Sequence, residues 1–158
     1  EGFYRRGRAV WLLGLSVVAM MILGASGAIT ALGDTLYPAS TLAEGLRQDF
    51  SSEASILLRL RIFHPMIAVT TAFLAGGTAY WLRQRYAHPR LQVLSLLLIC
   101  VFVLQLVLGV INVILLAPVW MQIVHLIVSE LAWIALILLA AVTLGTVDLL
   151  PGPVEGKI

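Results

Sequence analysis

Four long apolar runs dominate this sequence, at about residues 10–32, 56–82, 91–116 and 119–144. Each can cross a bilayer, whose hydrocarbon core of roughly 30 Å needs about 20 helical residues. Because no water inside a bilayer can satisfy free backbone groups, such runs must be helical. We therefore predict an all-α fold: an antiparallel four-helix transmembrane bundle that occupies residues 1–158 as a single domain.

Composition supports this class and excludes others. Of the 158 residues, 61% are apolar and 11% are charged, so too few polar side chains remain to coat a soluble domain. Disordered chains, coiled coils, secreted disulfide scaffolds and ordinary cytosolic enzymes are excluded. The net charge of +2 is too small to indicate a nucleic-acid-binding surface, and the single Cys100 allows no internal disulfide. Since the chain begins with Glu1 rather than Met, we expect it to be part of a longer protein.

The distribution of Lys and Arg predicts the orientation. One side of the bundle carries seven of the ten cations, namely Arg5, Arg6, Arg8, Arg83, Arg85, Arg90 and Lys157. The other side carries Arg47, Arg59 and Arg61. By the positive-inside rule we expect both termini in the cytoplasm, and we expect the membrane to be a bacterial plasma membrane.

The outward loop at residues 33–55 contains a helix signal. Thr41 and Glu44 have the spacing of a capping box. Leu42, Leu46 and Phe50 then recur every four residues. The pattern predicts a short amphipathic helix on the outer membrane surface, with a solvated loop as the alternative because Gly45 weakens the helix.

Two histidines lie inside the apolar runs at similar depth. His64 is eight residues into the second run and His125 is six residues into the fourth. At about 1.5 Å per residue, both lie roughly 9–12 Å below the outer membrane edge. In an up-down bundle these runs point the same way and are diagonal neighbours, so the two imidazoles can bind a haem iron from both sides. The alternative is two unrelated polar contacts between helices.

Small side chains leave room beside both histidines, although small residues also serve close helix packing in membranes. They form stripes in all four runs: Gly24, Ala28 and Ala31, with Gly27 beside them; Ala68, Thr71, Ala72 and Ala75; Gly109 between Gln105 and Asn112; and Ser129 with Ala132.

Three residues near His64 add to the prediction. Pro65 leaves the carbonyl of Arg61 without its usual donor, which predicts a bend. Arg61 lies three residues outward of His64 on the same face, within reach of haem propionates that point outward. Arg59 is a second candidate for this role, and the alternative for both arginines is snorkelling to headgroups.

The other reactive residues receive simpler interpretations. No cysteine or carboxylate lies level with the histidines, which disfavours zinc. Glu130 is deeper and on a different face, where it can be protonated, relay protons or pair with a neighbouring subunit. We expect His88 to be solvated in its loop and Cys100 to be an inert core residue.

Five separated segments carry a family pattern: residues 24–38 (GASGAITALGDTLYP), 45–50 (GLRQDF), 59–65 (RLRIFHP), 108–112 (LGVIN) and 122–126 (QIVHL). Together they resemble the haem A synthase family, specifically its second half, over nearly the whole chain. That family has two similar four-helix halves, each with a histidine pair. The first half is thought to oxidise the C8 methyl group of haem O, and the second holds a haem B that passes electrons.

The resemblance implies that His64 and His125 are the axial ligands of haem B. It also implies a partner, either the first four-helix half of the same protein or a docked membrane subunit. Two features of the first half are missing here, because the outer loop has no cysteine pair and no glutamate lies shortly before His64. We therefore expect that this chain alone does not oxidise the methyl group.

Three classes of function remain at this point. The first is the haem B half of a haem A synthase, and the second is a stand-alone cytochrome b-like electron carrier of a membrane complex. The third, a scaffold or transporter without redox chemistry, is the weakest because no run is broken as a substrate site would require.

Overall fold

Six helices make up residues 2–146, which are the part of the chain that this computed structural model describes. They are α1 (Gly2–Leu36), α2 (Leu42–Asp49), α3 (Ile56–Arg61), α4 (Phe63–Arg85), α5 (Pro89–Ile114) and α6 (Val119–Thr146), and no strand occurs within these residues. Four segments are long and apolar enough to cross a membrane: Gly7–Leu36, Ile56–Arg85, Pro89–Ile114 and Val119–Thr146. The predicted four-helix membrane bundle is confirmed.

Most helix ends differ from the predicted ones by a few residues, and the largest difference is at α1. Helix α1 is longer at both ends, because the chain stays helical beyond its apolar run. Helix α5 ends at Ile114 rather than Leu116, because Leu116 and Ala117 adopt left-handed backbone angles, with φ of 62° and 51°. This turn is closed by the Ala117 N–H, which donates to the Asn112 carbonyl at 2.8 Å.

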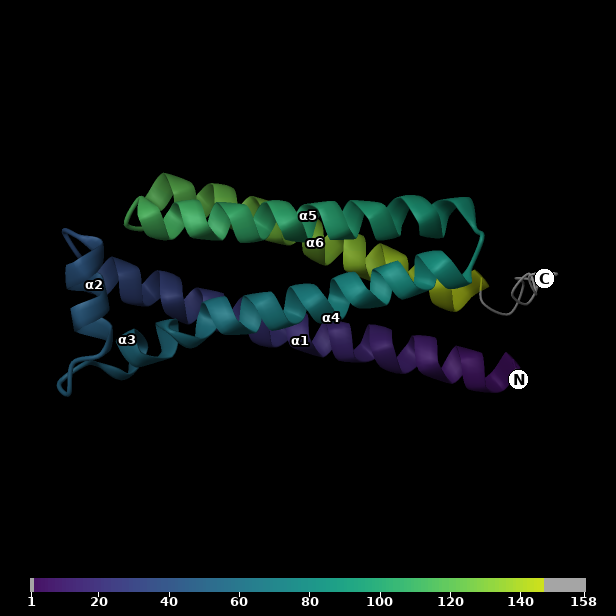
Figure 1. Cartoon of the computed structure of the whole chain (residues 1–158), viewed down its shortest axis with the longest axis horizontal. Coiled ribbons are helices and arrows are strands. Elements are labelled where there is room, and N and C mark those ends of the chain that lie inside the picture. Colours follow the sequence, from purple (N-terminus) through teal and green to yellow (C-terminus); the bar gives the residue numbers. More distant parts are fainter. Residues whose placement is uncertain (1, 147–158) are drawn as a thin grey trace, which may run out of the picture.

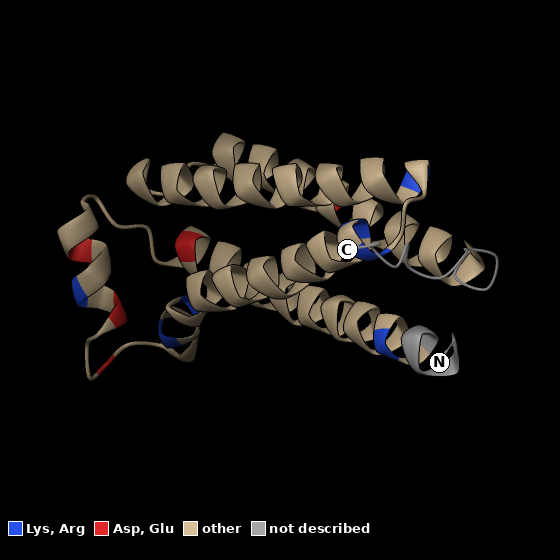
Figure 2. Cartoon of the chain, turned by 45° about the vertical axis from the view of Figure 1, so that its right-hand side comes forward, with Lys and Arg blue, Asp and Glu red and all other residues tan. Residues whose placement is uncertain are grey.

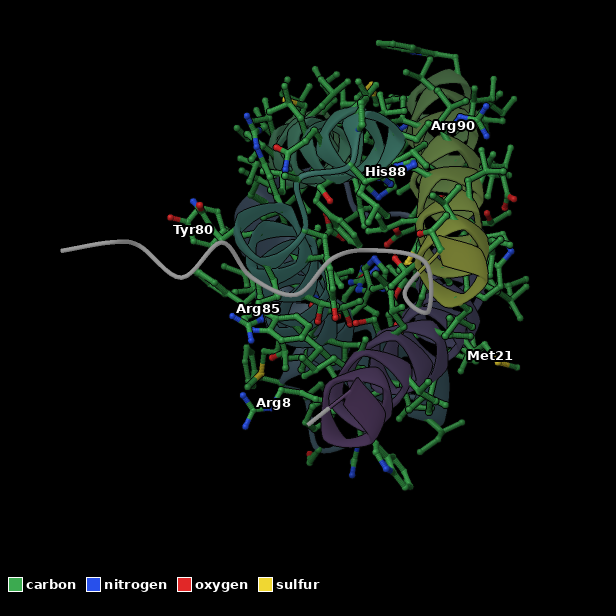
Figure 3. The ribbon with its side chains drawn as sticks, turned by 90° about the vertical axis from the view of Figure 1, so that its right-hand side faces the viewer. Arg8, Met21, Tyr80, Arg85, His88 and Arg90 are labelled. Atoms are coloured by element: carbon green, nitrogen blue, oxygen red, sulfur yellow. The ribbon has the colours of Figure 1, made fainter. Side chains whose placement is uncertain are left out.

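The four long helices lie at the corners of a square. Helix α4 packs against α1 and α5, and α6 packs against α5 and α1. Viewed from the end that carries the start of α1, the helices follow one another around the square in the order α1, α4, α5, α6 (Figure 3). The prediction that the second and fourth membrane helices are diagonal neighbours is therefore confirmed.

The hydrophobic core occupies only one end of this square. At the end away from α2, where α1 begins and α6 ends (Figure 1), the buried side chains come from all four long helices. They include Leu13 and Met20 of α1, Ala79 and Leu82 of α4, Leu98 and Phe102 of α5, and Ala132 and Leu136 of α6. The end near α2 has smaller and more polar residues between the helices, and both intramembrane histidines lie there.

The predicted amphipathic helix in the outer loop is confirmed as α2. Its N-cap is Thr41, whose hydroxyl accepts a hydrogen bond from the Glu44 N–H. The Glu44 carboxylate accepts hydrogen bonds from both the hydroxyl and the N–H of Ser40. These bonds lower the pKa of Glu44, so their contribution to loop stability is present near neutral pH and is lost only as the pH falls through that lowered pKa.

A helix interruption lies where Pro65 predicts a distortion. The second membrane segment is divided at Ile62, which separates α3 from α4. Pro65 is the third residue of α4, and it has no N–H to donate to the carbonyl of Arg61 one turn earlier. The interruption thus places His64 in the first turn of a new helix.

Candidate cofactor site

His64 and His125 lie on diagonal helices at the end of the bundle that carries α2. His64 is the second residue of α4 and His125 is the seventh of α6. Both are half-buried. The structure therefore brings together the two residues that the sequence singles out.

A serine on α1 determines the tautomer of His64. Nδ1 of His64 lies 2.9 Å from the Ser26 hydroxyl oxygen. That hydroxyl donates its single proton to the Leu23 carbonyl at 2.8 Å, so towards His64 it can only accept. In this arrangement Nδ1 carries the proton, and the lone pair of Nε2 is free to bind a metal.

His125 has a different environment, built by α5. Gln105 donates from Nε2 to the backbone carbonyl of His125 at 2.9 Å. Nδ1 of His125 is buried without a partner, and the same is true of the side-chain oxygens of Gln105 and Asn112. Three unsatisfied polar atoms thus belong to residues at this end of α5 and α6.

Two glycines give the imidazole rings their space. A Cβ added at Gly27 would lie 3.2 Å from Cε1 of His64, and one added at Gly109 would lie 3.3 Å from Cε1 of His125. Both separations are tighter than ordinary van der Waals contact. On the first run it is therefore Gly27 that adjoins a histidine ring, whereas Gly24 and Ala28 of the predicted stripe are exposed.

The donor set suits a metal macrocycle. Within the described residues, no group of three or more His, Cys, Asp or Glu side chains could enclose a metal ion. Two imidazoles from diagonal helices could instead provide ligands on two sides of one metal, a set used for iron in haem.

Arg61 is held in an ion-pair network that the sequence analysis did not anticipate. Its Nη1 donates to Asp34 and its Nε to Asp49, both at 2.7 Å. The three side chains are only 12–18% exposed. Because Asp34 is near the end of α1, Asp49 ends α2 and Arg61 ends α3, the network ties the outer loop to the bundle one turn before His64. Because Asp49 and Asp34 lie 12 and 27 residues from Arg61 in the sequence, no local sequence pattern predicts these ion pairs.

Replacing Arg61 with leucine should destabilise this end of the bundle. Two nearly buried carboxylates would lose their cation, at a cost of about 2 kcal/mol, less than the ~3–5 kcal/mol for a fully buried pair. Arg59→Leu is the matched control, because Arg59 is exposed and donates only to the Ser52 carbonyl; we expect less than about 0.5 kcal/mol there. Thermal unfolding in detergent measures both, and equal stability of the two variants would contradict a structural role for the network.

Charged residues outside the site have distinct positions. Apart from Glu130 on α6, the acidic residues of the described chain gather around α2 and the adjacent helix ends, where Arg47, Arg59 and Arg61 also lie (Figure 2). The opposite end carries Arg8, Arg85 and Arg90 (Figure 3).

Two expectations about single residues are wrong. His88 is the N-cap of α5 at the far end of the bundle and is half-buried rather than solvated, with Nδ1 shielded. Cys100 is exposed on α5 rather than buried in the core, because it lies on the outer face of that helix. Glu130 is exposed on α6.

A groove of about 560 Å³ runs between α1 and the α3–α4 segment. It is lined mainly by apolar side chains such as Ile22, Phe63 and Met66, and by Ser26. Neither histidine lines it, so the groove is separate from the proposed ligand pair, although Ser26 contacts both.

Comparison with known proteins is consistent with this site. Residues 3–138 match the COX15-CtaA family, described as cytochrome oxidase assembly proteins. Two curated relatives, both named protoheme IX farnesyltransferase and from two strains of Thermus thermophilus, are 38% identical over 126 residues. These matches cover 80% of this chain but 21% of each relative, so the chain spans about a fifth of their length. No solved structure matches.

Proposed function

This chain belongs to the COX15-CtaA family of cytochrome oxidase assembly proteins, and we propose that it is the haem B-binding, electron-transferring half of a haem A synthase. The family is a haem A synthase family of the membrane and serves haem A biosynthesis. The observation that carries the finer assignment is the pair of imidazoles on diagonal helices, with the Nε2 lone pair of His64 left free by Ser26.

Residues of all four long helices would hold the haem. His64 and His125 would supply the iron-binding nitrogens, Ser26 would orient the ring of His64, and Gly27 and Gly109 leave room for both rings. When bound between two imidazoles, haem iron supplies one-electron transfer. The proposed redox role therefore needs no acid–base residue at the site.

The two arginines beside His64 remain our candidates for the propionates. Arg61 has its charge compensated by Asp34 and Asp49. Arg59 is exposed and donates a hydrogen bond to the neutral backbone carbonyl of Ser52. A guanidinium with free donors binds a carboxylate better than one already paired, so Arg59 is the freer of the two.

Purified protein should contain about one non-covalent b-type haem per chain. The sequence has no Cys-x-x-Cys-His motif for covalent attachment, and the structure offers one pair of facing imidazoles. A pyridine haemochrome assay after expression with ample haem measures the ratio. A haem-free protein under those conditions would overturn the proposal.

We propose that methyl oxidation requires a second site outside this chain. If both imidazoles are ligands, the iron keeps no open coordination position for an oxidation. The described residues contain one further histidine, His88, at the opposite end of the bundle. Another four-helix half, linked or docked, would therefore hold the substrate haem O.

The isolated chain should accordingly fail to convert haem O to haem A. The test supplies haem O, a reductant and oxygen to the purified chain, and then separates the extracted haems by chromatography. The two-half protein is the positive control. Haem A formed by the isolated chain at a comparable rate would make this bundle the catalytic half.

Glu130 is our candidate contact for that partner. It is exposed on α6, eleven residues or roughly 16 Å from the start of this helix, and a carboxyl group facing lipid at that depth is costly. Glu130 lies at the centre of a row of exposed isoleucines on α6, with Ile123 and Ile127 before it and Ile134 and Ile137 after it. Together the five residues are spaced by four, three, four and three positions, which is the spacing of a helix-packing seam. We also propose a bacterial plasma membrane location with both termini in the cytoplasm.

The name of the Thermus relatives concerns farnesyl transfer to protohaem IX. We do not assign that reaction to this chain, because the match covers 21% of those proteins. A stand-alone cytochrome b-like carrier is the alternative, and it predicts full function without any second half.

A further inference from the structure

Gln105 has a position beside His125 that resembles the position of Ser26 beside His64. Its carboxamide nitrogen donates to the backbone carbonyl of His125 at 2.9 Å. Its carboxamide oxygen is buried without a partner, and so is Nδ1 of His125. A hydrogen-bond acceptor on Gln105 and a ring nitrogen of His125 that can donate thus belong to two residues already joined by a bond from the Gln105 side chain to the His125 backbone.

The imidazole of His125 lies over the face of α5 that carries Gln105. Cε1, the ring atom between the two nitrogens, faces Gly109, which is one helical turn beyond Gln105. Buried polar groups nearly always find a partner, either directly or through an ordered water. If Nδ1 of His125 carries the proton, it can donate a hydrogen bond to the side-chain oxygen of Gln105, and both buried atoms then have a partner.

We propose that Gln105 is the positioning residue of His125, accepting a hydrogen bond from Nδ1–H at its side-chain oxygen, directly or through one buried water. This inference rests on the proposed haem ligation, because its consequence is a free Nε2 on His125. Both imidazoles would then present the same nitrogen to the metal, one held by Ser26 from α1 and the other by Gln105 from α5. Outer partners of this kind set ring orientation and ligand basicity.

Asn112 is the competing partner, since its side-chain oxygen is also buried and unsatisfied. It lies on the same face of α5, seven residues from Gln105. Gln105 is favoured because it is already bonded to the residue whose ring it would hold.

The test reads the tautomer of His125 without haem. The chain has three histidines, so ring-¹⁵N-labelled histidine gives three sets of signals, which His→Gln variants assign. We expect His125 of the apo-protein to be mainly the Nδ1–H tautomer. In Gln105→Leu we expect the population of this tautomer to fall and that of the Nε2–H tautomer to rise. The Gln105→Glu variant keeps an acceptor and should restore the Nδ1–H tautomer.

Gln92→Leu is the matched control on the same helix. Gln92 also joins helices through its carboxamide, donating to the carbonyls of Arg83 and Tyr86 at 2.6 and 3.0 Å, but it lies at the far end of α5. If Gln105 served only helix packing, Gln105→Leu and Gln92→Leu would have the same effect on haem binding and on the tautomer of His125. We expect only Gln105→Leu to weaken haem binding, about 10- to 100-fold, and to raise the midpoint potential, because a less basic imidazole stabilises ferric iron less.

Three results would overturn the inference: an Nε2–H tautomer of His125 in the unsubstituted protein, an unchanged tautomer in Gln105→Leu, or a larger change in Asn112→Leu. The first needs no substitution at Gln105, so it decides the matter even if Gln105→Leu does not fold. A chain that binds no haem but shows the expected tautomers would refute the proposed function alone. A haem-binding chain whose His125 ignores Gln105 would refute this inference alone.

Discussion

Replacing either His64 or His125 with alanine is expected to remove most of the bound haem. In the proposed site each imidazole supplies one of the two iron ligands, and the only other histidine of the described residues, His88, lies at the opposite end of the bundle. The loss should exceed the roughly 10- to 100-fold effect of removing an outer hydrogen-bonding partner. Haem per chain, with the visible spectrum of any remainder, measures it.

His88→Ala is the control for the loss of an imidazole. His88 caps α5 at the opposite end of the bundle, so its removal should leave haem content and the low-spin spectrum unchanged. Since Nδ1 of His88 is shielded, a modest change in stability is compatible with this expectation. Equal haem retention in all three variants would show that the ligands are misassigned.

Much of the fold could be predicted because lipid imposes strong rules on sequence. Apolar length determines the four membrane helices, and their alternating direction predicts that α4 and α6 are diagonal. The cap at Thr41 is a local pattern of four residues, so α2 could be predicted as well. His64 and His125 stand out because ionisable groups are rare at that depth.

The remaining features depend on contacts between distant segments. The ion pairs of Arg61 join residues from three helices, and sequence periodicity does not reveal which carboxylate meets which cation. The same limit explains why Ser26 and Gln105 were not identified as partners of the histidines, although Gln105 was noted on the inner face of its helix. Cys100 was misplaced because an apolar run does not distinguish the lipid-facing side of a helix from its core side.

Side chains added at Gly27 or Gly109 should reduce haem binding sharply while the bundle stays folded. The Cβ of alanine would lie 3.2 Å from the His64 ring and 3.3 Å from the His125 ring, so each ring must shift by a few tenths of an ångström. Valine adds two more methyl groups and should displace the imidazole from its ligating position. Sites of this kind require placement within about 0.5 Å, so we expect partial loss of haem with alanine and at least about tenfold loss with valine.

Stability should change in the opposite direction, which separates a ligand-site defect from unfolding. Alanine is favoured over glycine within a helix by about 1 kcal/mol, so the apo-proteins of Gly27→Ala and Gly109→Ala should unfold no earlier than the parent. Gly14→Ala and Gly76→Ala are the controls, because a Cβ at either position meets nothing within 4 Å. They should gain similar stability and keep their haem. If the control variants lost as much haem as Gly27→Ala and Gly109→Ala, the space beside the two rings would have no special role, and the assignment of these glycines to the haem site would fail.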